Sequence, residues 1–331
     1  MKVYKTNEIR NVVLIGGAKT GKTTLSESML FEGGLINRRG TVEDKNTTSD
    51  YREIELERQN SVLSTVMYVE HKGNKINFID APGFDDFIGE VVAALNVCDT
   101  ALMVVNGQNG VEVGTEINWR HSAKTKTPVV FLVNHLEHEN SSFEETLRQL
   151  KQQFHGGVVP IQYPVNEGIG FNAIIDVLQQ KMLKYPANGG KAEVLDIPDS
   201  EKDKAAEMHA ALIEAAAEND EALMEKFFEV GTLTEEEMIQ GLKLGIMKRG
   251  MFPVMCIIIS YLPAPNEMPG RKNNNGKYLN CNPADPTSLF IFKTSIEEHL
   301  GEISYFKVYA GEVTEAMDLI NRSNSSKERI P

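Results

Sequence analysis

The stretch NVVLIGGAKTGKTT, residues 11–24, decides the fold of the N-terminal half. An apolar run typical of a buried strand leads into glycines, and a run with helical spacing follows. Gly16, Gly21, Lys22 and Thr23 fit the spacing G-x-x-x-x-G-K-[ST]. Glycines let backbone N–H groups approach phosphates, the lysine reaches the β- and γ-phosphate oxygens, and the threonine hydroxyl binds Mg²⁺. The sequence therefore predicts a phosphate-binding loop made of Gly16, Gly17, Ala18, Lys19, Thr20, Gly21, Lys22, Thr23 and Thr24.

Alternating strand and helix patterns extend outward from this loop. A helix is expected over 23–34, and a hairpin over 61–83 is expected to turn at residues 72–74. The apolar runs at 100–107 and 128–135 are continuous, as in strands of a parallel sheet that is covered on both faces. With a helix between these runs, the pattern predicts an α/β fold with a doubly wound, mostly parallel sheet.

The pattern changes in the second half of the chain. A charged, alanine-rich stretch, in which Thr234 and Glu237 form a capping box, predicts an α-rich inserted subdomain at about 157–250. We place the first domain at 1–263 and a Pro- and Asn-rich linker at 264–284. Strand patterns in 285–331 predict the beginning of a β-barrel domain. These residues are too few to close a barrel, so we expect a fragment of a longer protein.

The composition is that of a soluble globular protein, with 41% hydrophobic and 24% charged residues among 331. Three cysteines without a CxxC pair fit a reducing compartment. We expect no signal peptide and no membrane span, and we expect the longest apolar run, CIIISYL at 256–262, to lie in the core. A net charge of −13 repels a phosphate backbone, so any nucleic-acid contact must be local or reached through a protein partner, and we expect no DNA partner.

A second motif lies in NFIDAPGFDDF, residues 77–87. Asp80 ends a strand and can hold Mg²⁺ through water, while the amide of Gly83 can meet a γ-phosphate. The Asp-x-x-Gly pattern alone is weak because many strands end this way, but a phosphate-binding loop upstream makes it specific. The next residue, Phe84, can neither donate nor accept a hydrogen bond.

A third motif, Asn134-His135-Leu136-Glu137, ends the strand at 128–135. GTP-binding domains place Asn-Lys-x-Asp here, and the Asp carboxylate accepts hydrogen bonds from guanine. Glu137 keeps a carboxylate one methylene further out, and His135 replaces the lysine. A weakened guanine contact and a turn without base contact both stay open. A metal site at His135, Glu137 and His138 is not expected, because the loop offers no fourth ligand.

Together these motifs resemble those of translational GTPases, most closely elongation factor G and its tetracycline-resistance ribosome-protection relatives. TSDYREIELERQNS (48–61) resembles switch I, FIDAPGFDDF (78–87) resembles Asp-Thr-Pro-Gly-His-Val-Asp-Phe, and VVPIQYPVNEGIGFNAIIDV (158–177) resembles the start of the elongation factor G insertion. GEISYFKVYAGEV (301–313) resembles the opening of domain II. The resemblance covers nearly the whole chain. It implies a P-loop GTPase domain with an insert, GTP or GDP and Mg²⁺ as ligands, and the ribosome, both rRNA and stalk proteins, as partner.

The chain departs from this family at its reacting centre. Phe84 stands where the family has the histidine that positions the hydrolytic water, and loss of such a group commonly costs about 10²–10⁴-fold in rate. Ser61 stands where the switch I threonine ligates Mg²⁺, so Thr23, Ser61 and Asp80 are the expected metal set. Lys19 replaces a phosphate-loop aspartate, and it either supplies a fixed charge to the phosphates or points into solvent.

The family's base loop, expected after MFPVM (251–255), is missing, since MCIIISYLPAP runs straight on. Either the guanine pocket lacks the side that this loop would form, or the sequence carries a deletion there.

These observations predict a monomeric, elongation factor G-like translational GTPase of the bacterial cytoplasm, acting in translocation, with hydrolysis slow or impaired at Phe84. A competent GTPase whose water is oriented by backbone groups and a ribosomal partner is one alternative. A ribosome-protection or rescue factor is another, and a nucleotide-independent pseudo-GTPase regulator is a third.

Overall fold

The structure, a computed structural model, describes residues 3–154, 156–186, 190–256, 262–273, 276–297 and 300–330. The chain divides into two compact units. The first comprises Met1–Tyr4 and Glu8–Ala264, and the second comprises Lys5–Asn7 and Pro265–Pro331. No helix in the described part of the chain is long and apolar enough to span a bilayer.

A seven-stranded sheet forms the centre of the first unit, with strand order β2-β3-β1-β4-β5-β11-β6. Only the β2–β3 pair is antiparallel among the pairings of these strands, and its turn lies at residues 72–73 as the sequence predicts. Every residue of β4 is buried, as its continuous apolar run indicates. The mostly parallel α/β sheet is therefore confirmed. The strands are β1 (Ile9–Ile15), β2 (Thr65–His71), β3 (Asn74–Asp80), β4 (Thr100–Asn106), β5 (Val129–Asn134), β6 (Val158–Pro160) and β11 (Phe252–Met255).

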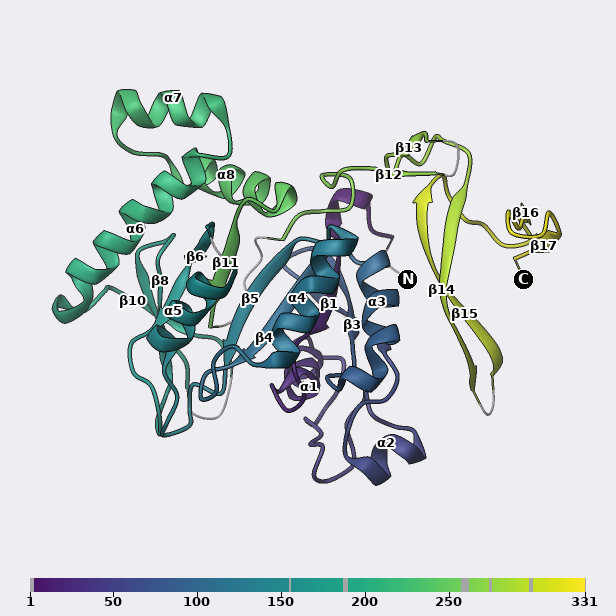
Figure 1. Ribbon diagram of the computed structural model, residues 1–331, viewed down its shortest axis with the longest axis horizontal. Coiled ribbons are helices and arrows are strands. Elements are labelled where there is room, and N and C mark those ends of the chain that lie inside the picture. Colours follow the sequence, from purple (N-terminus) through teal and green to yellow (C-terminus); the bar gives the residue numbers. More distant parts are fainter. Residues whose placement is uncertain are drawn as a thin grey trace. The chain divides into compact units, whose positions relative to one another are not determined.

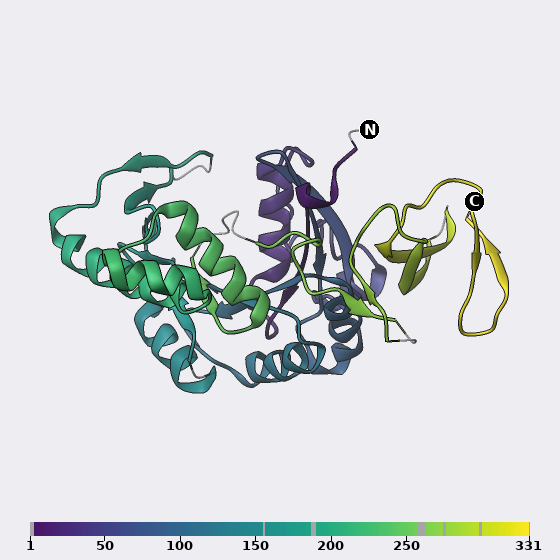
Figure 2. The ribbon, with the colours of Figure 1, turned by 90° about the horizontal axis from the view of Figure 1, so that it is seen from above.

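Helices cover both faces of this sheet, which makes it doubly wound (Figures 1 and 2). One face carries α1 (Lys22–Glu32), and the other carries α3 (Ile88–Val97), α4 (Val113–Thr125) and α5 (Phe143–Phe154). An aromatic cluster centred on Trp119 of α4 holds α4 and α5 against the sheet. The Trp119 ring lies 5.9 Å from that of Phe131 in β5, 4.6 Å from Phe154 in α5 and 4.8 Å from Phe252 in β11. Such contacts add stability beyond the area that they bury.

The segment expected as the insert begins with β6, which pairs with β11 in the central sheet. Its helical part is as expected, comprising η3 (Asp199–Glu201), α6 (Lys202–Ala217), α7 (Glu221–Val230) and α8 (Glu235–Lys248). The predicted capping box is present, because Thr234 N donates to Glu237 Oε2 at 2.9 Å and Glu237 N donates back to Thr234 Oγ1 at 3.4 Å.

Before these helices lies an antiparallel sheet that the sequence pattern did not predict. Its order is β10-β9-β8-β7, and its strands are β7 (Gln162–Pro164), β8 (Ala173–Asp176), β9 (Lys181–Lys184) and β10 (Glu193–Leu195). Strands of three or four residues are too short to show a clear alternation of polar and apolar residues. The insert is therefore mixed, with a sheet as well as helices.

The second unit consists of antiparallel pairs. They are β12 (Arg271–Lys272) with β13 (Tyr278–Leu279), β14 (Ser288–Glu297) with β15 (Gly301–Ala310), and β16 (Asp318–Ile320) with β17 (Lys327–Arg329). The first pair lies inside the segment expected to be a linker. Cys281 N also donates to Tyr309 O at 3.0 Å, so that segment is joined to β15 rather than free of structure.

Candidate nucleotide-binding site

The three sequence motifs meet at the carboxyl edge of the central sheet. In the parallel register Leu14 lies opposite Asp80, and Asn106 lies opposite Asn134. The loop after β1, the end of β3 and the end of β5 therefore share one edge. β1 lies between β3 and β4, where the order of strands reverses. Doubly wound sheets bind their ligands in the crevice that opens at this position.

The glycine-rich loop requires its glycines. Gly16 has φ of 139°, and a Cβ there would lie 2.3 Å from Val104 O. Gly21 has φ of 87°, and a Cβ there would lie 2.3 Å from Asn134 Nδ2. That amide donates to Thr20 O at 2.9 Å. The end of β5 thus packs directly on the loop that follows β1, which only glycine at position 21 permits.

Lys22 is buried inside this loop, with 6% of its surface exposed. Its Nζ donates to Gly16 O at 3.0 Å and to Gly17 O at 2.7 Å. Burial lowers the pKa of Lys22 to about 8, although the charges of Asp80 and Asp50 act in the opposite direction. An anion beside this ammonium would favour its charged form. The side chain is therefore placed to receive phosphate oxygens.

The three residues expected to hold Mg²⁺ come together. Thr23 Oγ1 lies 3.2 Å from Ser61 Oγ, although the two residues are 38 positions apart. Asp80 is fully buried, and burial raises its pKa against the opposing effects of the Ser49 hydroxyl and of Lys22. Hydroxyl and carboxylate oxygens are the hard ligands that Mg²⁺ prefers. The donor set of Thr23, Ser61 and Asp80 thus fits this ion.

Asp50 joins this cluster, and sequence reasoning did not single it out. It is 4% exposed, and burial raises its pKa to about 7, while the nearby Ser61 hydroxyl acts in the opposite direction. The negative charge of Asp80 adds to the upward shift. Two buried carboxylates therefore face one lysine, an arrangement that attracts a cation. The resemblance of residues 48–61, which include Asp50, to switch I was the available signal.

Two buried glutamates and one half-buried glutamate hold the segment between α1 and β2, and sequence reasoning missed these as well. Glu55 of α2 (Glu53–Arg58) is fully buried and accepts from Val62 N at 3.1 Å and Leu63 N at 3.0 Å. Glu90 Oε2 accepts from Ser64 N at 2.8 Å. Glu27 of α1 accepts from Gly40 N at 2.9 Å. These carboxylates order the segment that carries Asp50 and Ser61.

Gly83 and Phe84 follow β3 on the other side of Lys22. A Cβ on Gly83 would lie 2.6 Å from Lys22 Nζ and 2.8 Å from Ala18 Cα, so residue 83 packs against the glycine-rich loop. Phe84 is 39% exposed and, with residues 58, 60, 86 and 87, lines a cavity of about 320 Å³. Lys19 is exposed and has φ of 61°. Phe84 therefore exposes its side chain to this cavity, and Lys19 exposes its side chain to solvent.

The last residue of β5 is Asn134, and the loop that follows carries His135 and Glu137. His135 has φ of 62°, and its Nε2 would lie 3.2 Å from a Cβ on Gly21. Its Nδ1 lies 3.5 Å from Glu137 Oε1, and the pKa of Glu137 is lowered, chiefly by the hydrogen bond with His135. The ligand atoms of His135, Glu137 and His138 lie within 4.8 Å of one another. The prediction that the base loop is missing falls on residues 257–261, which lie outside the described residues.

Comparison with known proteins agrees with this geometry. Residues 7–264, more than half of the chain, match the elongation factor Tu GTP-binding domain family. The chain also resembles the crystal structure of ttk003000868 from Thermus thermophilus, with 28% sequence identity and a TM-score of 0.86. That similarity covers 98% of this chain and 48% of the other, so the chain spans about half the length of that protein. The chain therefore belongs to the elongation factor Tu GTP-binding domain family and has the fold of a translational GTPase.

Proposed function

We propose that this chain is an elongation factor G-like GTPase that binds GTP with Mg²⁺ and acts on the ribosome during translocation. The observation that carries the proposal is the convergence of Lys22, Thr23, Ser61 and Asp80 beside a glycine-rich loop. In this assignment 16–24 binds the phosphates and Lys22 reaches their terminal oxygens. Mg²⁺, held by Thr23, Ser61 and Asp80, neutralises phosphate charge when it is bound.

The remaining residues of the site are assigned to the γ-phosphate and to the base. The amide of Gly83 is assigned to the γ-phosphate, and its close packing on the glycine-rich loop supports that role. Asn134 holds the loop through Thr20, and Glu137 accepts hydrogen bonds from guanine. GDP occupies the same site without the γ-phosphate contact.

We propose that hydrolysis in this chain is slow. Phe84 follows Gly83, whose amide is assigned to the γ-phosphate, and its ring offers no group that could orient a water molecule. Lys19, which is exposed, would add a positive charge only by turning toward the phosphates. Slow hydrolysis need not prevent switching, because γ-phosphate binding alone can favour one conformation of switch I.

The ribosome as partner rests on the family and on the resemblance to elongation factor G. The net charge of −13 disfavours free RNA, so we propose that stalk proteins and docking geometry carry the encounter. The proposal includes a monomer in the cytoplasm, and a domain division into 1–263, 264–284 and 285–331. Since the chain spans 48% of the similar structure, translocation is a proposal for the longer protein.

A second candidate is a regulator of the ribosome that uses no nucleotide. The pairing of Glu137 with two histidines favours it, because these contacts occupy the carboxylate that would read guanine.

The test is a titration of the chain with fluorescent GTP, GDP and ATP in Mg²⁺ buffer. We expect dissociation constants on the order of micromolar or lower, with GTP preferred over ATP. Glu137→Ala should remove the preference for GTP, by about 1–3 kcal/mol, and leave ATP binding unchanged. If none of the three nucleotides binds, the proposal is overturned in favour of the second candidate.

A further inference from the structure

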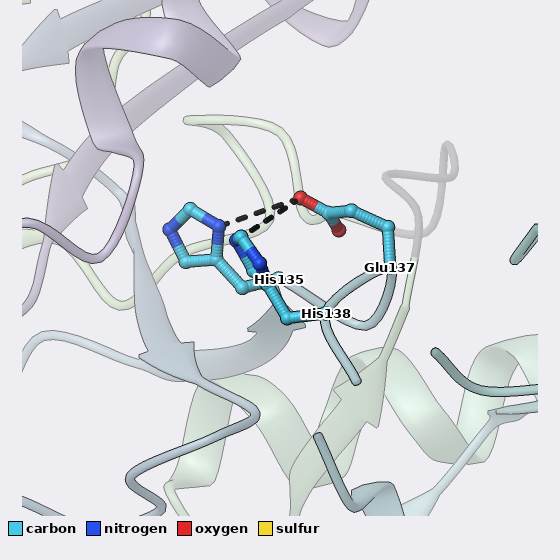
Figure 3. A group of neighbouring side chains, drawn as sticks. All are labelled: His135, Glu137 and His138. Atoms are coloured by element: carbon cyan, nitrogen blue, oxygen red, sulfur yellow. Dashed lines mark ion pairs between the residues drawn. The ribbon is translucent and has the colours of Figure 1, made fainter. Parts of the chain in front are cut away.

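Among the residues that the structure describes, one group of three His, Cys, Asp or Glu side chains brings its ligand atoms together. It consists of His135, Glu137 and His138 in the loop after β5, and Figure 3 shows the two rings and the carboxylate turned toward one another. Glu137 Oε1 lies 3.5 Å from His135 Nδ1 and 3.8 Å from His138 Nε2. The same carboxylate oxygen thus faces both imidazoles.

The loop that carries these side chains is held by its backbone. Leu136 is 1% exposed, and its carbonyl accepts from Gly168 N at 2.8 Å and from Ser141 Oγ at 2.9 Å. His138 N donates to His135 O at 3.3 Å, which closes a turn. Because Leu136 is anchored in the core, its two neighbours are held on the outer side of the loop. The group is therefore pre-positioned by contacts that do not involve its own ligand atoms.

The spacing suits a small tetrahedral metal ion. Zinc binds imidazole nitrogen at about 2.0–2.1 Å and carboxylate oxygen at about 2.0–2.2 Å, which puts neighbouring ligand atoms about 3.4 Å apart. The separations of 3.5 and 3.8 Å from Glu137 Oε1 require only small shifts to reach that value, and all three ligand atoms lie within 4.8 Å of one another. Two imidazoles favour zinc-class ions, whereas Mg²⁺ prefers oxygen ligands. The metal set at Thr23, Ser61 and Asp80 and this group would therefore select different ions.

Access to the group is open. The side chains of His135, Glu137 and His138 are 23%, 55% and 49% exposed. Three protein ligands with solvent at the fourth position is the arrangement of open zinc sites. The missing fourth protein ligand, which argued against a site from the sequence, is therefore no obstacle.

We propose that His135 Nδ1, Glu137 Oε1 and His138 Nε2 bind one zinc-class divalent ion, with water at the remaining position. The ion and guanine would then compete for Glu137, and this competition rests on the function proposed above. His135 also lies against Gly21 of the glycine-rich loop through its other ring nitrogen, so the ion would be coupled to the phosphate side of the site.

The metal site itself is tested without nucleotide. The full chain, in Mg²⁺ buffer, is titrated with Zn²⁺ against a chromophoric chelator, and Co²⁺ absorption reports the coordination geometry. We expect one ion per chain. His138→Ala and Glu137→Gln should each weaken Zn²⁺ binding at least about tenfold, because even outer-shell changes cost about 10–100-fold. His71→Ala, at an exposed histidine at the end of β2, is the matched control and should leave the affinity unchanged.

Equal Zn²⁺ affinity in the wild-type chain and His138→Ala would overturn the site. All variants change exposed side chains, and circular dichroism is the check that each variant is folded.

The competition is tested by repeating the GTP and ATP titrations with Zn²⁺ present. In the wild-type chain, we expect Zn²⁺ to weaken GTP binding at least about tenfold more than ATP binding. In His138→Ala, we expect Zn²⁺ to weaken the binding of the two nucleotides equally. This variant also controls for Zn²⁺ that binds to the nucleotide phosphates. An equal effect in both chains would overturn the competition. If no nucleotide binds at all, the proposed function fails, while the chelator titration still decides the metal site.

Discussion

At the scale of single residues, Phe84 is the position at which the proposed slow hydrolysis can be tested. Phe84 is 39% exposed and lines a cavity at the surface, so a polar side chain would fit there without disturbing the core. We expect Phe84→His to raise single-turnover GTP hydrolysis on ribosomes by about 10²-fold or more, with unchanged affinity for GTP. Phe87→His, in the lining of the same cavity, is the control and should change neither. Wild-type hydrolysis already as fast as that of Phe84→His would contradict the assignment.

Replacing Gly83 tests how the segment after β3 packs on the glycine-rich loop. A methyl group at this position would overlap Lys22 Nζ and Ala18 Cα, and the second of these is backbone that cannot rotate away. We expect Gly83→Ala to lower the free energy of unfolding by about 1–3 kcal/mol and to weaken GTP binding. Gly89→Ala, in α3, meets no atom within 4 Å and should be neutral or stabilising by up to about 1 kcal/mol. Urea unfolding of the two variants measures the difference.

Asp50 gives the nucleotide-free chain a dependence on pH. Its pKa rises from 3.8 to about 7, chiefly through burial, so between these values the folded state binds a proton that the unfolded state has lost. Stability therefore falls as pH rises through this window. Asp50→Asn removes the effect, and we expect it to be more stable than the wild-type chain by at most about 4 kcal/mol at pH 8.

The gain from Asp50→Asn should shrink to under about 1 kcal/mol near pH 4. Urea unfolding at the two pH values, with a chelator present, provides the measurement. A gain that does not depend on pH would show that Asp50 is ionised in the folded chain throughout.

At the scale of elements, the segment from α2 to β2 depends on Glu55. Its buried carboxylate satisfies the N–H groups of Val62 and Leu63, so Glu55→Ala leaves two donors without a partner, at about 1–3 kcal/mol each. We expect faster proteolysis within residues 38–64 and a lower thermal midpoint. Glu53→Ala, on an exposed position of the same helix, is the control. Equal cleavage rates in the two variants would show that Glu55 does not order the segment.

The elements also show how far sequence patterns reach. The β4 and β5 strands were predictable because a strand covered on both faces is apolar at nearly every residue. The capping box at the start of α8 was visible for a similar reason, since its partners Thr234 and Glu237 lie three residues apart. The sheet of β7–β10 was not predictable, because strands this short are defined by the neighbours with which they pair.

At the scale of the whole molecule, the division after Ala264 predicts that nucleotide binding belongs to the first unit alone. A chain truncated to residues 1–264 keeps β11, the last strand of the central sheet, and every proposed ligand residue. We expect it to unfold cooperatively and to bind GTP within about threefold of the affinity of the full chain. A loss of binding larger than tenfold would show that the second unit contributes to the site.

The sequence by itself determined the phosphate-binding loop, the alternation of strands and helices and the positions of Asp80 and Asn134. These follow from periodicity and from residues close in the chain, which one local pattern can specify. Only the tertiary structure decided that Thr23 meets Ser61, that Asp50 and Glu55 are buried, and that one oxygen of Glu137 faces two histidines. Burial and side-chain approach depend on how segments distant in the sequence pack against each other. No local pattern records that packing, and the packing gives these carboxylates their surroundings and their partners.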